Sequence, residues 1–229
     1  MSTICIGIGQ CGVSCTDALL QRLSLEEEND YFYYLQSEKK QSPRAILIDT
    51  EPKAISKHIC SSHSWSYDPR NTFILGQSGA GNNWGCGYNI GNEKKTGILE
   101  SVQHEAEKCD QLECLSIQQS AAGGTGSGLG TSLTEDFRDQ FQNLTLMNTV
   151  ICPFIIGEVI VQHYNSCFSL SHLIDLSDGI FLIENESISN ECTSLLQIKQ
   201  PSFSHLNNLI GQYLSTIMLS SSSSSSSSS

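Results

Sequence analysis

The sequence predicts an α/β fold in which helices cover both faces of a parallel β-sheet. Six short apolar runs recur along the chain, at residues 3–8, 44–49, 71–75, 112–117, 148–156 and 179–184. Between several of them, apolar residues repeat every three to four positions, which is the spacing of a helix. Strands that alternate with helices form a parallel, doubly covered, Rossmann-like sheet, and such sheets bind ligands outside the carboxyl ends of their strands.

The elements follow in order from this pattern. The run at 3–8 leads into a glycine-containing turn at 9–12, and the charged stretch 24–34 reads as a helix end or loop before the second strand. The fourth strand ends in a long glycine-rich segment that opens a helix, where apolar residues recur every four positions from Leu129 to Phe141. After the sixth strand, a last amphipathic helix spans 203–217.

The charge of the chain limits its partners. Twelve lysines and arginines stand against 24 aspartates and glutamates, which gives a net charge of −12. We therefore expect no nucleic acid or anionic membrane partner, because binding a phosphate polymer needs clustered cations. The longest apolar run, 149–161, is interrupted by Pro153 and Glu158 and is too short to span a bilayer. A phosphate ligand would have to be held by backbone N–H groups and a metal ion.

Ten cysteines are distributed along the chain without a C-x-x-C pair, and the six histidines form no ligand-spaced cluster with them. The N-terminus carries no basic stretch before the first strand, so we expect no signal peptide. This usage predicts reduced thiols in the cytosol rather than disulfides or a metal site formed by cysteine.

The glycine-rich segment AAGGTGSGLG, residues 121–130, predicts a phosphate-binding turn. Its glycines let the backbone approach an anion, and it feeds a helix N-terminus, where free N–H groups and the helix dipole favour negative charge. It is not a Walker loop, because no Gly-Lys-Ser/Thr occurs in the chain. The alternative is a flexible connector, which the flanking strand and helix make less plausible.

A second glycine motif, GIGQCG at 7–12, fits the dinucleotide-binding pattern G-x-G-x-x-G. An NAD(P)-dependent oxidoreductase would use Gly7, Gly9 and Gly12, and it would need an acidic residue about 20 residues further on, at the end of the second strand. The acid that ends the second strand is Asp49, 37 residues after Gly12. We therefore assign Gly7 to the strand and disfavour the redox alternative.

Five motifs together resemble the tubulin family: GQCG at 9–12, IDTEP at 48–52, GQSGAGNNW at 76–84, GGTGSG at 123–128 and YNSCFSLSHL at 164–173. They occur in the family's order and at compatible spacing over residues 1–219. Three stretches, at 45–55, 106–110 and 157–166, resemble the delta branch more than alpha, beta or gamma tubulins. The resemblance implies the GTPase-domain fold shared by tubulin and FtsZ.

The resemblance also implies binding of GTP or GDP with Mg²⁺, and no residue is assigned as catalytic. Asp49 and Glu51 would hold Mg²⁺; taken alone, these two residues could also form a strand end with a solvated turn. Paired asparagines suit guanine, and Phe203 would stack on the base unless it is a core residue of its helix. The implied nucleotide contacts are Gln10, Cys11, Asn82, Gly123, Gly124, Thr125, Gly126, Ser127, Gly128, Glu158, Asn185, Phe203 and Asn207.

The chain departs from the family at Ser14, where a glutamine contacts the base in alpha and beta tubulins, and at Gln162, which replaces an acid. These departures keep open a nucleotide-free interaction module with the same fold.

We expect a GTP-binding domain over 1–219, truncated in its core helix, and a disordered poly-serine tail over 220–229. Since the second half of a tubulin supplies the residue that activates hydrolysis, we expect binding without efficient turnover. The resemblance implies other tubulins, or microtubule and centriole components, as partners. It places the protein in the cytoplasm and cytoskeleton, at the centriole or basal body and the cilium.

Overall fold

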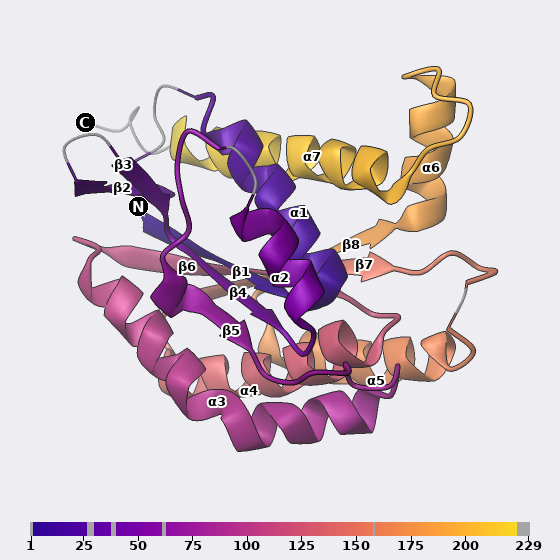
Figure 1. Cartoon of the computed structure of the whole chain (residues 1–229), viewed down its shortest axis with the longest axis horizontal. Coiled ribbons are helices and arrows are strands. Elements are labelled where there is room, and N and C mark those ends of the chain that lie inside the picture. Colours follow the sequence, from indigo (N-terminus) through magenta and orange to yellow (C-terminus); the bar gives the residue numbers. More distant parts are fainter. Residues whose placement is uncertain (1, 27–29, 38–39, 61–62, 158, 224–229) are drawn as a thin grey trace.

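A computed structural model describes residues 2–26, 30–37, 40–60, 63–157 and 159–223 of the protein (Figure 1). Two short turns accompany the regular elements, a 3₁₀ turn at Pro69–Asn71 and a π-helical turn at Thr125–Leu129. The regular elements are β1 Ser2–Ile8, α1 Gly9–Leu23, β2 Tyr33–Ser37, β3 Lys40–Pro43, β4 Ala45–Asp49, α2 Pro52–Ile59, β5 Thr72–Ile74, α3 Trp84–Glu107, β6 Leu112–Ser120, α4 Gly130–Gln140, β7 Thr145–Cys152, α5 Gln162–Leu176, β8 Gly179–Glu184, α6 Asn185–Ser194 and α7 Phe203–Ser223.

The main sheet has six parallel strands in the order β5-β4-β1-β6-β7-β8. All six predicted strands are confirmed, although β7 stops at Cys152, before Pro153, which cannot donate to a strand ladder. The order reverses between β1 and β6. Their carboxyl ends therefore flank the switch point at which folds of this type bind their ligands.

The strand residues alternate between two apolar layers. Along β1, Cys5 packs in one layer with Leu47, whereas Ile4, Ile6 and Ile8 pack in the other. Figure 1 shows α1, α2, α6 and α7 on one face of the sheet and α3, α4 and α5 on the other. The doubly wound architecture predicted from the sequence is confirmed.

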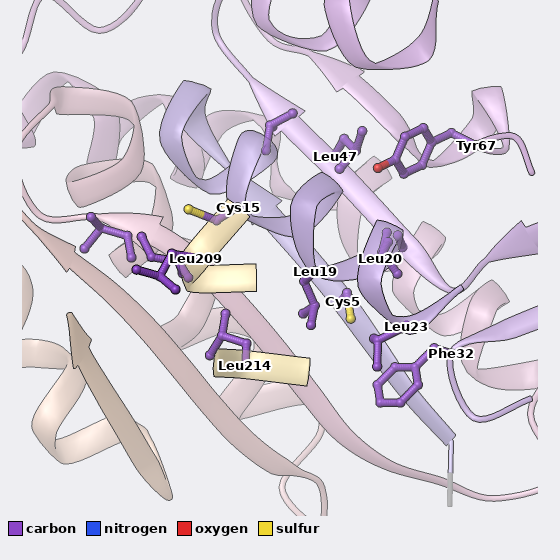
Figure 2. Packing of buried hydrophobic residues seen from close by; sticks show 14 of the residues in the cluster. Cys5, Cys15, Leu19, Leu20, Leu23, Phe32, Leu47, Tyr67, Leu209 and Leu214 are labelled. Atoms are coloured by element: carbon purple, nitrogen blue, oxygen red, sulfur yellow. The ribbon is translucent and has the colours of Figure 1, made fainter. Parts of the chain in front are cut away.

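The first layer joins α1 to α7. Leu19 and Leu20 of α1 pack with Leu209 and Leu214 of α7 over β1 and β4 (Figure 2), and all four are buried. The apolar repeat predicted for residues 203–217 is thus largely the buried face of α7. Phe203 and Ile217 are the exceptions, with 65% and 42% of their surfaces exposed, so Phe203 is not a core residue.

The structure also contains an antiparallel hairpin, β2–β3, which the sequence did not predict. Tyr33 begins β2 and is buried, and its hydroxyl donates to the Leu20 carbonyl at 2.6 Å. The aromatic run at 31–34 therefore anchors the hairpin to α1.

The predicted domain boundary falls inside α7, which continues to Ser223, while residues 224–229 lie outside the described residues. The disordered tail stays a prediction. The ten cysteines are free thiols. Within the described ranges, no helix has the length and apolar character needed to cross a membrane.

Candidate functional site

A cavity of about 980 Å³ opens at the carboxyl edge of the sheet, beside the switch point. We call it the main cavity. Its walls come from the start of α1, the β4–α2 junction, the 76–83 loop, the turn after β6, residues 153–157 and 159–162, and the N-termini of α6 and α7. Pockets of this size accommodate drug-sized ligands and cofactors. The topology therefore brings segments far apart in sequence to one site.

The glycine turn, residues 121–128, forms the wall above β1 and β6. Gly9 begins α1 with a positive φ of 73°, and a Cβ there would lie 2.9 Å from the Gly126 nitrogen. Thr125 Oγ1 lies 2.6 Å from Thr50 Oγ1 at the end of β4. The turn is thus packed against both neighbouring loops and is not a flexible connector.

Ser127 and Gly128, the last two residues of the glycine turn, do not line the cavity. Ser127 is buried and donates its hydroxyl to the Gly123 carbonyl, while a Cβ on Gly128 would lie 1.9 Å from the Trp84 carbonyl oxygen. The structure therefore gives these two residues a packing role against α3.

Asn165 of α5 joins the 76–83 loop to the glycine turn. Its side-chain amide donates to the Asn82 carbonyl at 2.9 Å and to the Ala122 carbonyl at 2.7 Å, and its oxygen accepts from the Trp84 N–H at 3.1 Å. Asn82 itself has a positive φ of 55° and faces the cavity. The buried side chain of Asn165 therefore fixes the 76–83 loop and the glycine turn relative to each other.

Asp49 ends β4 with one carboxylate oxygen unpaired. Its Oδ1 accepts from the N–H groups of Thr50 at 2.6 Å and Glu51 at 3.3 Å, whereas Oδ2 is buried and without a hydrogen-bond partner. Burial raises the pKa of Asp49 to about 6, although the backbone hydrogen bonds lower it. A cation would pair with Oδ2 and lower the pKa of Asp49, so that the carboxylate is charged at neutral pH. Asp49 and the neighbouring Glu51 therefore fit a hard metal ion.

Within the described residues, no group of three or more His, Cys, Asp or Glu side chains is arranged to hold a metal. The protein would therefore supply one or two carboxylates, and the ligand's own oxygens would supply the rest. Mg²⁺ is commonly bound in this way, through carboxylates, substrate phosphates and water.

The far end of the cavity is lined by α6, α7 and one side of α1. Asn185 is the first residue of α6, and Asn207 accepts a hydrogen bond from the Cys15 thiol at 3.5 Å. Phe203 contacts Phe154 edge-on, with ring centroids 6.3 Å apart, and remains exposed at the opening. Two amide side chains and an exposed aromatic ring therefore line this end of the cavity.

The main cavity brings together most of the predicted site residues. Glu158 lies outside the described residues, and Ser127 and Gly128 do not line the cavity. Those that line the cavity are Gln10, Cys11, Asp49, Glu51, Asn82, Gly123, Gly124, Thr125, Gly126, Asn185, Phe203 and Asn207.

Several lining residues were not predicted, among them Ser120, Asp17 and His58. Ser120 could have been found, because it is the last residue of β6 and directly precedes the glycine turn. Asp17 and His58 gave no signal, since they lie in separate helices and meet only through the packing of α1 on α2.

A family model, Tubulin/FtsZ family, GTPase domain, matches residues 2–193. The chain belongs to this family. Membership in the Tubulin/FtsZ family implies guanine nucleotide binding, and it explains why the glycine turn lies at the switch point of a doubly wound sheet.

The relatives agree with the delta branch. The chain is 38% identical to the tubulin delta chains of Canis lupus familiaris and Homo sapiens, over 95% of its own length and 52% of theirs. It is 34% identical to the tubulin beta chain of Candida albicans, over 95% of its length and 48% of that chain. The chain thus spans about half the length of the curated relatives it matches.

Proposed function

We propose that the chain binds GTP or GDP with Mg²⁺ in the main cavity, as the nucleotide-binding domain of a delta-tubulin-like cytoskeletal protein. The observation that carries this proposal is the meeting of the glycine turn with the unpaired oxygen of Asp49 at the switch point. A glycine backbone offers donors for phosphate oxygens, and a carboxylate offers a ligand for the metal that accompanies them.

In this arrangement the phosphates lie along Gly123, Gly124, Thr125 and Gly126, with Gln10 and Asn82 at the sides. Asp49 and Glu51 hold Mg²⁺ directly or through water. The bound ion supplies the positive charge that the cavity needs, because Asp17, Asp49 and Glu51 line it together with only Lys57 and His58 as basic residues among the described lining. Phosphate binding without the ion would set like charges against each other.

At the other end, Asn185 and Asn207 read the base and Phe203 stacks on it. An amide group can donate to guanine O6 and accept from its N1–H or 2-amino group, whereas adenine presents the reverse order of donor and acceptor and has no 2-amino group. The edge-on contact between Phe154 and Phe203 fixes the second ring beside the opening.

We further propose that the protein acts with other tubulins, or with microtubule and centriole components, in the cytoplasm and cytoskeleton and at the centriole or basal body and the cilium. The similarity to tubulin delta chains supports this role. Fluorescent tagging in ciliated cells tests it, and a diffuse signal without centriolar foci would contradict it.

A dinucleotide such as NAD⁺ is the alternative to GTP or GDP as the ligand of the main cavity. Asp49 ends the strand next to β1, which is the topological position of the ribose-binding acid in NAD-binding folds, although its sequence spacing differs. NAD⁺ therefore belongs in the test beside guanine nucleotides.

Isothermal titration of the whole chain with GTP, GDP, ATP and NAD⁺, each with and without Mg²⁺, tests the proposal. We expect GDP and GTP to bind at least tenfold more tightly than ATP and NAD⁺, and Mg²⁺ to strengthen GTP binding. The Asn207→Ala variant should lose affinity for GDP by about three- to tenfold, since it loses one or two hydrogen bonds. The exposed Asn190→Ala is its matched control. Binding of NAD⁺ more tightly than GDP and GTP would establish the redox alternative. If none of the four ligands binds, the result would establish the nucleotide-free module.

A further inference from the structure

The outermost strand of the main sheet, β8 (Gly179–Glu184), leaves one edge of the sheet open. Among the described strands, β7 is the one that pairs with β8, whereas β5 at the opposite edge has three residues. The β7–β8 ladder keeps a single register along β8, without a bulge. The strand reads GIFLIE, so it lacks the lysine, proline or bulge that commonly protects a strand edge from pairing with another chain.

The hydrogen bonds of β7 show which of its backbone groups point toward β8. The Ala121 N–H donates to the Ile151 carbonyl at 3.0 Å, so the backbone groups of Ile151 point toward β6. Backbone groups alternate between the two sides of a strand. Those of Val150 therefore point toward β8.

Leu182 directs its own backbone groups to the open edge of β8. It is in register with Val150. In a parallel ladder a residue bonds to the two neighbours of its register partner, and the neighbours of Leu182 are Phe181 and Ile183. The N–H and C=O groups of Leu182, and those of the residues two positions before and after it, therefore point to the open edge. These residues are Ile180 and Glu184.

The side chains at the open edge are apolar on both faces of the sheet. Phe181 and Ile183 pack partly against the layer that contains α7, and Ile180 packs partly against Leu173 of α5. Leu182 lies on the α5 face and is 53% exposed. The open edge therefore combines unpaired backbone groups with an apolar side chain that α5 leaves uncovered.

Helix α5 adds a second apolar residue beside this edge. His172 Nδ1 lies 2.7 Å from Glu135 Oε1, so the His172 side of α5 faces α4. Ile174 is two positions further on, which is about 200° around the helix. Because α5 connects β7 to β8, its side away from α4 lies toward β8. Ile174, at 66% exposed, therefore flanks the open edge on the same face as Leu182.

We propose that β8 pairs antiparallel with β8 of a second copy of this chain, about a two-fold axis at Leu182, so that two main sheets join into one. This inference goes beyond the proposed function and does not depend on it. Ile180 and Glu184 lie symmetrically about Leu182, so this axis gives the outward backbone groups of all three residues a partner in the other copy. A two-fold contact uses the same surface on both copies and therefore closes as a dimer.

The side chains suit this pairing. On the α7 face, Phe181 of each copy lies opposite Ile183 of the other, and aromatic pairs with β-branched residues stabilise antiparallel strands. On the α5 face, Glu184 lies opposite Ile180, so within β8 no carboxylate faces another. Stable interfaces bury about 1,000 Å² or more. The axis places α5 of both copies on one face, where Ile174 and Leu182 add apolar area to that of the strands.

Sedimentation velocity of the whole chain over a range of concentrations tests the proposal. We expect a monomer–dimer equilibrium that Leu182→Lys weakens by at least about tenfold, because it sets two ammonium groups side by side at the axis. Ile74→Lys is the matched control, since Ile74 is 47% exposed on β5 at the opposite edge. The control should dimerise as the parent does.

A charge exchange at Leu182 tests the position of the axis. Leu182→Glu alone should also be monomeric. A mixture of Leu182→Lys and Leu182→Glu should form a dimer, because the lysine of one copy then lies beside the glutamate of the other. The same mixture of Ile74→Lys and Ile74→Glu should behave as the parent does. If the Leu182 mixture stays monomeric, the axis does not pass through Leu182 and this inference is wrong.

Salt and hydrogen exchange give two further readouts on the unmodified chain. Each copy carries a net charge of −12, so added salt should strengthen an apolar contact by screening the repulsion. Amide exchange in residues 179–184 should slow as the protein concentration rises. This readout decides the question even if Leu182→Lys fails to fold in a urea titration.

Four results would overturn the inference. The chain could be a monomer at every concentration, or form assemblies larger than a dimer. The dimer could survive Leu182→Lys in a folded protein, or weaken with added salt, which would indicate ion pairs in place of an apolar edge. Each of these results leaves the proposed nucleotide site untouched, because the test contains no nucleotide.

Discussion

At the scale of single residues, Asp49 lowers the stability of the folded state at neutral pH and is proposed to bind Mg²⁺. Its Oδ2 is buried without a partner, and burial raises its pKa to about 6. The folded state therefore binds a proton more tightly than the unfolded chain does, and the stability that this proton provides is lost as the pH rises from about 4 through 6. A shift of about two pKa units corresponds to at most roughly 3 kcal/mol.

Asp49→Asn removes the buried charge and keeps the acceptor for the Thr50 and Glu51 N–H groups. We expect the free energy of unfolding, measured in urea without nucleotide, to rise by about 1–3 kcal/mol at pH 7 and by less at pH 5. The same variant should lose the strengthening of GTP binding by Mg²⁺. The exposed Asp139→Asn is the control, and an Asp49→Asn protein that is less stable than the parent at pH 7 would argue against this account.

The sequence could place a residue on the cavity wall where that residue stands next to a recognisable boundary. Asp49 ends a strand, and Asn82 and Gly123 lie in glycine-rich loops, so the parallel topology brings them to one edge. His58 and Asp17 are 41 positions apart and in two helices, and only the packing of α2 on α1 makes them neighbours. No local pattern could have predicted that contact.

At the scale of elements, the glycine sequence of the turn serves its packing against α3 as well as the proposed contact with a ligand. The sequence indicated one role for all of its glycines, which was phosphate binding. The structure separates them: Gly123, Gly124 and Gly126 line the cavity, whereas Gly128 lets the backbone of α3 approach the turn. This difference depends on the distance between the backbones of the turn and α3, which the sequence does not contain.

The β2–β3 hairpin was not predicted, because its strands are short and lie outside the main sheet.

Gly128→Ala should therefore destabilise the fold before it affects any ligand contact. Its Cβ would lie 1.9 Å from the Trp84 carbonyl oxygen and 2.7 Å from the Tyr88 nitrogen, so backbone must shift. We expect the free energy of unfolding in urea to fall by about 1–3 kcal/mol. In α3, by contrast, Gly97→Ala meets nothing closer than a Phe73 ring atom at 3.6 Å and should raise stability by about 0.5–1 kcal/mol. Equal effects of the two changes would contradict this assignment.

At the scale of the whole molecule, the cavity depends on both helical layers. Its walls include α1, α2 and α7 from one layer and the loops that precede α3, α4 and α5 from the other, and Asn165 links the loops before α3 and α4. A ligand in the main cavity therefore contacts segments that the sheet otherwise keeps on opposite faces. Loops with few buried apolar contacts open locally more easily than core strands do, so they are the parts that a ligand can stabilise most.

Hydrogen–deuterium exchange tests this picture directly. We expect GDP with Mg²⁺ to slow exchange together in residues 9–14, 49–52, 76–83, 120–126 and 203–208, because all of these segments line one cavity. The β2–β3 hairpin and the C-terminal part of α3, which do not line it, should exchange at unchanged rates and serve as internal controls. ADP with Mg²⁺ at the same concentration should leave every segment unchanged if the base is read at the far end. Protection by GDP of the glycine turn alone would mean that the nucleotide contacts only one wall, and the assignment of Asn207 and Phe203 to the base would then be wrong.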